Sequence, residues 1–526
     1  MRSLRDNRLT LVTGLAAALP VVIATVDALA GGWLPLGDRA VIAVRSFDVL
    51  STHPPLLGQY SSSSQILGEP VHSPGPLLYW LLALPVRVDR SAPALVMGVV
   101  NTAAVMAAVA LARRRGGVAL MFATGAGLAL MLASLDSSLP YDIWNPAAGL
   151  LPFTLLIFLA WSLACGEWRL LPLTALVASF AVQAHLAYAL PAGALLVVAG
   201  GFLMGSGGFL MGSGAPVPRR RLVATMAVLA LCWIAPLAEE LIHRPGNVER
   251  IVRSGLTDKP TLGAKAGLNG VLRAVGMPPW WLRGPRTPFE RVADVNFSPP
   301  AATTVAALSV LLGLAVLTAL ALARQRRDLA AAGGLALAMM PALAVVTAST
   351  PTTGILFGSV GYSLWWASPA GMFAWLALGL LAARLVLPLR SPAWARSPAP
   401  MAAGVVAVTA VALSVAAGAG PDRLEGAWKP ADRLLAALRD EAPPGTLRVT
   451  GPKTTLGFEL QGGAVLTLRQ RGPRPLSSLP GVGTPYDPRR HPHDGVVRVG
   501  DRRPAGRVIA RATLSGGRVL TATLAR

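Results

Sequence analysis

The sequence predicts a mainly α-helical, polytopic membrane protein with about eleven transmembrane helices and a small C-terminal α/β domain outside the membrane. Only 14% of its residues are charged, whereas soluble domains contain roughly 25%. Apolar runs of about 20 residues, the length that crosses a bilayer, recur along the chain. After residue 419 these runs stop, and short β-rich segments take their place.

The apolar runs define a membrane domain over residues 1–419, interrupted by long loops at 31–91 and 243–300. The first run is too long and too weakly flanked to be a cleaved signal peptide, so we expect it to be retained as a helix. The expected spans lie at about 10–30, 92–112, 117–134, 147–165, 170–185, 188–205, 222–241, 301–323, 329–348, 363–383 and 400–419.

Arginine clusters in the short loops predict the orientation, because cytoplasmic loops carry an excess of basic residues. Such clusters precede the first span and follow every second span, which places all of them on one side of the membrane. The clusters are Arg2, Arg5 and Arg8; Arg113 to Arg115; Arg169; Arg219 to Arg221; Arg324, Arg326 and Arg327; and Arg384, Arg390 and Arg396. We therefore expect a plasma-membrane protein with a cytoplasmic N-terminus and an extracytoplasmic C-terminal domain.

The net charge of +22 raises the alternative of nucleic-acid binding. Only four of the 47 basic residues are lysines, and most arginines lie in clusters between apolar runs. That distribution is typical of membrane topology and not of a phosphate-binding groove, so nucleic acid is not an expected partner.

The segment 420–526 predicts a small α/β domain. It contains a helix-like stretch, "WKPADRLLAALRDEAPPG", and β-rich runs such as "TLRVTG" and "GVVRVG". It closes on "RVIARATLSGGRVLTATLAR", which predicts a hairpin with its turn at Ser-Gly-Gly.

Ionisable residues are scarce within the spans and gather at the predicted outer surface. A transporter needs such groups near the bilayer midplane, so this distribution favours a site at the outer interface. The outer loop after the first span opens with residues 38–50, which contain no helix breaker and predict an interfacial helix. On that helix Asp38 and Arg45 share one stripe, and Asp48 lies one turn beyond Arg45, where we expect a salt bridge.

Several blocks resemble the GT-C superfamily of polytopic membrane glycosyltransferases, in particular an actinobacterial branch grouped with the mannosyl- and aminoarabinose-transferase-like members. The blocks are "PLGDRAV", "HSPGPLLYWLLALP", "YDIWNPAAGLLPF", "ASFAVQAHLAYALP" and "HRPGNVERI", and the resemblance covers roughly residues 10–400. It implies transfer of a sugar from a polyprenyl-phosphate carrier to a cell-envelope glycan or lipid acceptor, with membrane lipids as neighbours.

The resemblance also implies that Asp38, just after the first span, is the catalytic carboxylate. The commonest family pattern has adjacent Asp-Glu here, whereas this chain has Asp38 followed by Arg39. The second carboxylate and any divalent cation, Mg²⁺ or Mn²⁺, are therefore left open. A carboxylate can take the proton of an attacking hydroxyl, and cationic side chains can stabilise the departing phosphate. The alternative for Asp38 is an N-cap of the interfacial helix.

We therefore expect Asp38 to be the general base of an inverting transfer. The expected substrate-binding residues are His72, Asp142, Asn145, His185, Arg45, Tyr60 and Glu69, and the expected carrier-phosphate ligands are Arg244, Arg250, Arg253 and Arg283. Two alternatives stay open: a transporter or flippase of lipid-linked glycans, and a non-catalytic envelope scaffold.

Overall fold

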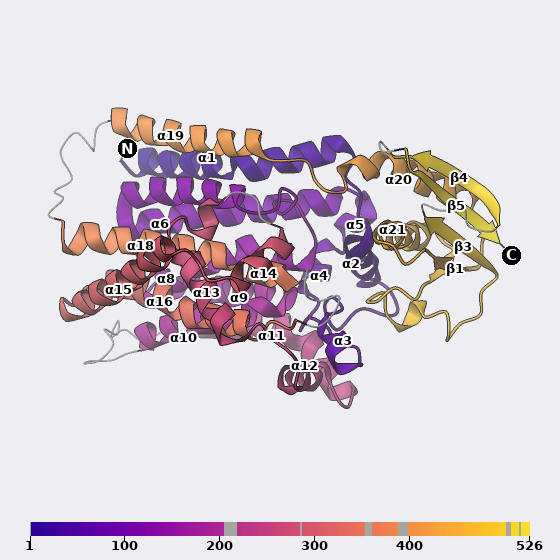
Figure 1. Cartoon of the computed structure of the whole chain (residues 1–526), viewed down its shortest axis with the longest axis horizontal. Helices are drawn as coiled ribbons and strands as arrows, with labels where there is room; N and C mark the ends of the chain where they lie inside the picture. Colours follow the sequence, from indigo (N-terminus) through magenta and orange to yellow (C-terminus); the bar gives the residue numbers. More distant parts are fainter. Residues whose placement is uncertain are drawn as a thin grey trace.

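The computed structural model describes residues 2–204, 218–283, 287–352, 360–387, 398–500, 506–514 and 517–525. Its long helices run along the long axis of the molecule, and the C-terminal sheet lies at one end of that axis (Figure 1). Helices α2 (Gly37–Asp48) and α5 (Pro85–Val88) lie between the bundle and the sheet. The molecule therefore has a helical membrane part and a mixed α/β part at one end.

Within the described residues, nine helices are long and apolar enough to span a membrane. They correspond to α1 (Arg2–Gly31), α6 (Ala92–Ala133), α8 (Leu150–Ala164, extended by α7 at Asn145–Ala148), α10 (Ala189–Met204), α11 (Arg219–Ile242), α15 (Ala301–Ala323), α16 (Arg327–Ala348), α18 (Ala367–Leu385) and α19 (Pro398–Gly418). A shorter apolar helix, α9 (Leu171–Ala184), lies where the short fifth span was predicted.

Helix α6 contains two of the predicted spans. It has 42 residues, about twice the length that crosses a bilayer, and it breaks at Gly117, whose φ of +80° is left-handed. Before the break, its contacts move toward the N-terminus of α1, from Gly98 against Thr25 to Arg113 bound to Thr10. After the break they move back toward the C-terminus of α1, with Gly125 against Ala17. The chain therefore reverses at Gly117, as the separate predictions for 92–112 and 117–134 require.

Several of the arginine clusters meet at the end of the bundle opposite the sheet. Arg115 pairs with Glu167, and Arg384 donates to the carbonyl of Gly116. Arg327 donates at 2.6 Å to each of two carbonyls, those of Ala164 and Phe202. These contacts place the loops after the second, fourth, sixth, eighth and tenth predicted spans at one end, in agreement with the predicted alternation. Arg390 and Arg396 lie outside the described residues.

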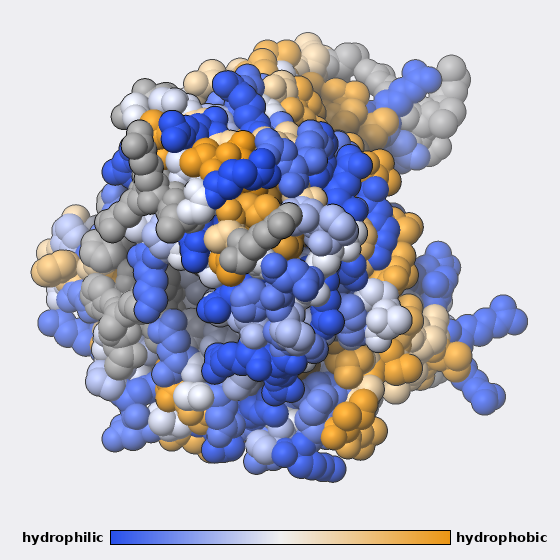
Figure 2. Space-filling model, turned by 90° about the vertical axis from the view of Figure 1, so that its right-hand side faces the viewer, coloured by the Kyte–Doolittle hydropathy of each residue, from blue (hydrophilic) through white to orange (hydrophobic). Residues whose placement is uncertain are grey.

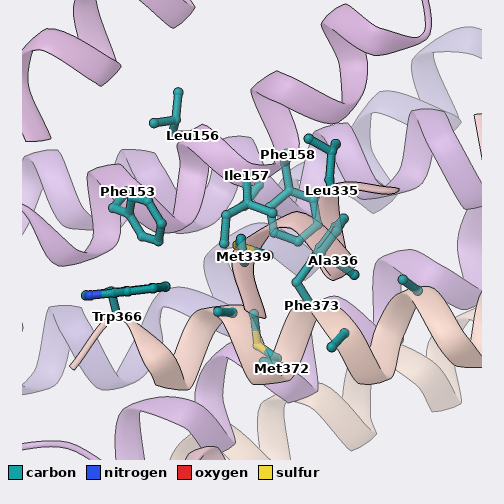
Figure 3. Packing of buried hydrophobic residues seen from close by; sticks show 14 of the residues in the cluster. Phe153, Leu156, Ile157, Phe158, Leu335, Ala336, Met339, Trp366, Met372 and Phe373 are labelled. Carbon is teal, nitrogen blue, oxygen red and sulfur yellow. The ribbon is translucent and has the colours of Figure 1, made fainter. Parts of the chain in front are cut away.

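The core of the bundle is built around α8, in which every residue is buried. Figure 3 shows two aromatic residues of α8, Phe153 and Phe158. They face Trp366, Met372 and Phe373, and Leu335 and Met339 of α16 lie beside them. The rings of Phe158 and Phe373 meet edge to face with centroids 5.5 Å apart. Helices α15 and α19 bury far less of their length, and their apolar outer faces suit contact with lipid.

The two long loops fold into short helices at the end of the bundle that carries the sheet. The first carries α2, α3 (Ser63–Leu67), α4 (Leu77–Leu82) and α5. The second carries α12 (Asn247–Leu256), α13 (Gly263–Val275) and α14 (Pro288–Asn296). Helix α12 packs against α3, so the two loops meet, whereas α13 packs against α15, α16 and α18. The interfacial helix predicted at 38–50 agrees with α2.

The C-terminal domain has a five-stranded sheet in the order β2-β1-β3-β5-β4 and two helices, α20 (Glu425–Glu441) and α21 (Thr455–Arg471). Its strands are β1 (Thr446–Thr450), β2 (Arg474–Leu476), β3 (Gly495–Gly500), β4 (Arg507–Thr513) and β5 (Val519–Ala525). Strand β1 runs parallel to β2 and β3, and β5 runs antiparallel to β3 and β4. The predicted closing hairpin is β4 and β5. Viewed from this end, the surface is mostly hydrophilic (Figure 2).

A buried polar contact joins this domain to α2. The carboxylate of Asp48 is fully buried and accepts hydrogen bonds from Tyr486 at 2.8 Å and from Arg469 at 3.1 Å. Arg45 pairs with the same carboxylate at 3.1 Å, as the sequence predicted. Since Tyr486 and Arg469 belong to the C-terminal domain, Asp48 fixes that domain on the membrane part.

Candidate functional site at the sheet end of the bundle

Helix α2 presents Asp38 and Arg39 in its first turn. Its N-cap is Leu36, and no side chain caps the helix, so Asp38 lies inside the helix and is not its N-cap. An acidic residue in the first turn is favoured by the helix dipole. The following residues, from Ala40 to Val44, are buried and anchor the helix in the molecule. The position of Asp38 is therefore set by a well-packed element.

Asp38 lies half-buried among polar and aromatic groups. The amide of Gln59 donates to its Oδ1 at 3.4 Å, and the hydroxyl of Tyr79 donates to the same Gln59 at 3.0 Å. The indole of Trp144 also donates to Asp38. Burial raises the pKa of Asp38, and the neighbouring Arg39 opposes that rise without cancelling it. A carboxylate with a raised pKa is a stronger general base.

Arg39 is held by Asp142, a residue from the loop between α6 and α7. Two guanidinium nitrogens donate to the two carboxylate oxygens, at 2.8 and 2.5 Å. Only 1% of Asp142 is exposed, and the backbone N–H of Trp144 donates to its Oδ1 at 2.8 Å. This planar pair of hydrogen bonds fixes the loop against the start of α2.

Aromatic rings and His185 form a wall beside Asp38. The ring of Trp144 meets that of Tyr362 at 4.8 Å, and Tyr362 meets His185 at 5.4 Å. The amide of Asn145 donates to the carbonyl of Ala184 at 3.0 Å, which ties the Asp142 loop to the end of α9. The structure therefore brings Asp38, Asp142, Asn145 and His185 together, although they come from three separate stretches of the sequence.

His185 is a neutral imidazole with a defined tautomer. Its Nδ1 accepts a hydrogen bond from the backbone N–H of Ala187 at 3.2 Å, so the proton of the neutral ring is on Nε2. Burial lowers the pKa of His185 to about 4. The ring can therefore donate a hydrogen bond from Nε2 without carrying charge.

A basic cluster lies further along α2. His72 and Tyr60 pair across an antiparallel bridge, with ring centroids 5.7 Å apart. Burial, together with the positive charges of Arg45 and Arg250, lowers the pKa of His72 to about 4. The Nδ1 atom of His72 is buried and has no hydrogen-bond partner. The charges of both arginines therefore act on His72, and of these three side chains only Arg45 has a carboxylate partner.

Asn247 connects this cluster to the membrane helices. Its side chain accepts from the backbone N–H of His72 at 2.9 Å and donates to the carbonyl of the same residue at 3.0 Å. Its own backbone N–H donates to Glu239, on α11, at 2.9 Å. Arg250, on the same helix as Asn247, donates to the carbonyls of Pro70 and Pro245.

The remaining predicted ligands lie elsewhere or have partners. Glu69 and Arg253 form a salt bridge of 3.6 Å, with both side chains more than 40% exposed. Arg244 is exposed. Arg283 pairs with Asp294 at 3.2 Å, on the segment around α14. Glu69 and Arg253 thus form a pair at the surface, and Arg283 belongs to an internal salt bridge. Neither these two pairs nor Arg244 contacts the cluster around His72 in the described structure.

Four residues of the site were not predicted as site residues: Gln59, Trp144, Tyr362 and Glu459. Trp144 lies two residues after Asp142, so the block "YDIWNP" could have indicated it. Tyr362 directly precedes the span predicted at 363–383. Glu459 is on α21 and 421 residues from Asp38, and no local pattern marks it.

A large groove opens close to the site. Its volume is about 1000 Å³, and it lies between α1, the last part of α6, α19 and the start of α20. Tyr141, the neighbour of Asp142 in the sequence, lines it and donates to Asp422 at 2.9 Å. Asp38 is not among its lining residues. The groove thus reaches Tyr141, whereas the Arg39–Asp142 pair does not line it.

The donor set does not suit a divalent cation. Among the described residues, no three His, Cys, Asp or Glu side chains come together as a group that could hold a metal ion. Both oxygens of Asp142 are already engaged by Arg39. Mg²⁺ requires several oxygen ligands in octahedral geometry, which this arrangement does not offer.

The bundle, the juxtamembrane helix after the first span and the C-terminal sheet domain together define a polytopic membrane protein with an α/β domain at one end of its helices. The chain is similar in structure to ArnT from Cupriavidus metallidurans, whose crystal structure is bound to undecaprenyl phosphate. The TM-score is 0.53 at 14% sequence identity, over 97% of each chain. This likeness shows the fold, which is the one that the GT-C resemblance implied. No protein-family model matches the sequence, and no curated protein matches it.

Proposed function

We propose that the protein is a membrane glycosyltransferase that moves a sugar from a polyprenyl-phosphate carrier to a hydroxyl of a cell-envelope acceptor. The observation that carries the proposal is Asp38, a half-buried carboxylate of raised pKa at the start of a juxtamembrane helix. The structural likeness to ArnT, a protein that binds undecaprenyl phosphate, supports a carrier of the same chemical class.

Asp38 is the general base in this mechanism. It removes the proton of the acceptor hydroxyl while the oxygen forms a bond to the anomeric carbon. The bond between that carbon and the carrier phosphate breaks on the opposite face, and its electron pair stays on the phosphate oxygen. The product has inverted configuration, the carrier leaves as polyprenyl phosphate, and the proton is left on Asp38.

The cluster of His72, Arg45 and Arg250 is the proposed site of the carrier phosphate. Arg45 is seven residues after Asp38 on α2, so the two share a face about 10 Å apart along the helix axis. Both the charge of Arg45 and that of Asp38 act on the Tyr79 hydroxyl between them. Guanidinium groups at this distance from the base can stabilise the charge that develops on the leaving phosphate.

The wall of Trp144, Tyr362 and His185 is the proposed sugar-binding surface. Aromatic faces offer a flat apolar contact for a sugar ring, and Nε2 of the neutral His185 can donate to a sugar hydroxyl. The site belongs to the end of the bundle opposite the arginine-rich loops. We infer from the positive-inside bias that this end faces the outside of the plasma membrane and that the N-terminus is cytoplasmic.

The test is transfer from a panel of undecaprenyl-phosphate-linked pentoses and hexoses by membranes that contain the wild type or the Asp38→Asn variant. Loss of a general base reduces the rate roughly 10²- to 10⁴-fold, so we expect the variant to be inactive but correctly folded. Asp440→Asn, on an exposed side chain of α20, is the control and should keep wild-type activity. Retained transfer by Asp38→Asn would remove Asp38 from the mechanism.

A further inference from the structure

Glu459, on α21, places a carboxyl group of the C-terminal domain against the start of α2. Its side chain is only 6% exposed. One oxygen, Oε1, lies 3.5 Å from the guanidinium of Arg423, which is itself 74% exposed. The other, Oε2, is buried and has no hydrogen-bond partner. A buried carboxylate oxygen without a hydrogen-bond partner raises the free energy of the folded protein, so a glutamate at this position requires an explanation.

Glycines on both helices allow this close approach. Gly37, the first residue of α2, has a left-handed φ of +53°, and a Cβ there would lie 2.2 Å from Oε2 of Glu459. On α21, a Cβ at Gly462 would lie 2.8 Å from the carbonyl oxygen of Gly37 and 3.1 Å from the Cβ of Ala40. The two helices therefore meet backbone to backbone, and Glu459 is held next to the residue that precedes Asp38.

The charged groups that face Glu459 are Arg39, Arg423, Asp38 and Asp142. The charge of Arg39, whose guanidinium is bound by both oxygens of Asp142, thus acts on three carboxyl groups, those of Asp38, Asp142 and Glu459. Burial raises the pKa of Glu459 to about 7; Arg39 and Arg423 oppose this rise, and the other two carboxylates add to it. Like charges this close do not all ionise together, so one carboxyl group of the cluster holds a proton near neutral pH.

We propose that the C-terminal domain supplies Glu459 to the transfer site as a second, proton-holding carboxyl group that tunes the basicity of Asp38. This inference rests on the proposed function, because it takes Asp38 to be the general base. When Glu459 ionises, its negative charge favours the protonated form of Asp38 and so makes Asp38 a stronger base. Glu459 acts through Asp38 and does not touch the sugar; its proton exchanges with solvent on the side of Arg423.

A spectroscopic titration tests the proton on Glu459 without any substrate. Infrared difference spectra of the full-length protein, recorded between pH 5 and pH 9, should show a protonated carboxyl band that disappears with a midpoint of about 7. The band should be missing in Glu459→Gln, which keeps the size of the side chain. It should persist in Glu441→Gln, a control on the same domain whose carboxylate is 43% exposed and pairs with Arg507 at 3.3 Å. A band unchanged in Glu459→Gln would overturn the inference.

The pH profile of transfer tests the coupling to Asp38. With the donor that the wild type uses, the rate should rise roughly threefold to tenfold through pH 7, and Glu459→Gln should keep the low-pH rate throughout. A step that persists in Glu459→Gln, or a folded variant with no activity at any pH, would refute the coupling. Failure of the proposed function would give a different result: either no donor is used, or Asp38→Asn still transfers sugar. The infrared titration of Glu459 needs no substrate and can be measured in either case.

Discussion

Arg39 and Asp142 are 103 residues apart in the sequence, yet the guanidinium of one and the carboxylate of the other form two hydrogen bonds at the entrance to the site. This pair occupies the position next to Asp38 at which the GT-C resemblance led us to look for a second acidic group. In this chain the position carries a cation, and its charge is matched by a carboxylate from another loop. The pair therefore holds the loop that carries Trp144 and Asn145 against α2.

Breaking the Arg39–Asp142 pair should destabilise the protein. Arg39→Met leaves the buried carboxylate of Asp142 without its partner, at a cost of about 3–5 kcal/mol. The double variant Arg39→Met/Asp142→Leu replaces the pair by apolar groups and should recover much of that loss. Thermal unfolding of the two single variants and the double variant in detergent measures the coupling. Strictly additive effects would show that the two side chains do not interact.

Loss of the Asp48 carboxylate should loosen the C-terminal domain. Asp48→Asn removes the negative charge that Arg45, Arg469 and Tyr486 share in a fully buried position. Hydrogen exchange of α21 should become faster, and protease should cleave the segment between α19 and α20 more readily. The control is Asp432→Asn, whose exposed carboxylate pairs with Arg90 at 3.0 Å and is worth at most about 1 kcal/mol. Equal protection in both variants would contradict the role assigned to Asp48.

Arg250 and Arg253, on the same helix, should differ in their effect on the carrier. Arg250 acts on His72, whereas Arg253 pairs with the exposed Glu69. A hydrogen bond to a charged group is worth about 1.5–3 kcal/mol, so Arg250→Ala should raise KM for the donor roughly 10- to 100-fold. Arg253→Ala should leave KM near the wild-type value. Initial rates over a range of donor concentrations decide between them, and the reverse order would place the phosphate at the surface.

Acid should destabilise the protein through the half-buried His185. The pKa of His185 is about 4, below the ordinary value of 6.5. Between pH 4 and pH 6.5 the imidazole is therefore protonated in the unfolded chain but neutral in the folded chain. Stability therefore falls as the pH is lowered from about 6.5 to about 4, by on the order of 3 kcal/mol for this residue.

His185→Asn should reduce this acid sensitivity, because the asparagine oxygen can accept from the N–H of Ala187 without titrating. Unfolding temperatures at pH 7, 5.5 and 4 measure the effect. The exposed His493 provides the control, and His493→Asn should follow the wild-type curve. Parallel curves for the wild type and His185→Asn would show that this imidazole is not the group that responds.

The sequence by itself determined where the chain can cross a membrane, because an apolar run long enough to cross a bilayer is a local property of the chain. Even the hairpin within α6 could be predicted, since Gly117 separates two such runs. The interfacial helix and its Arg45–Asp48 pair also follow from local spacing. His72, Asp142, Asn145 and His185 could be predicted as polar groups at the outer surface.

Only the tertiary structure decided which of these groups meet. The sequence could not show that Asp142 binds Arg39, or that Tyr362 and His185 lie ring to ring, because contacts across a hundred residues leave no periodic signal. Charge in a loop likewise does not reveal its partner, and so Arg283 was predicted as a phosphate ligand although it pairs with Asp294. Glu459 reaches the site because glycines on α2 and α21 let two backbones touch, and that packing is a property of the folded molecule alone.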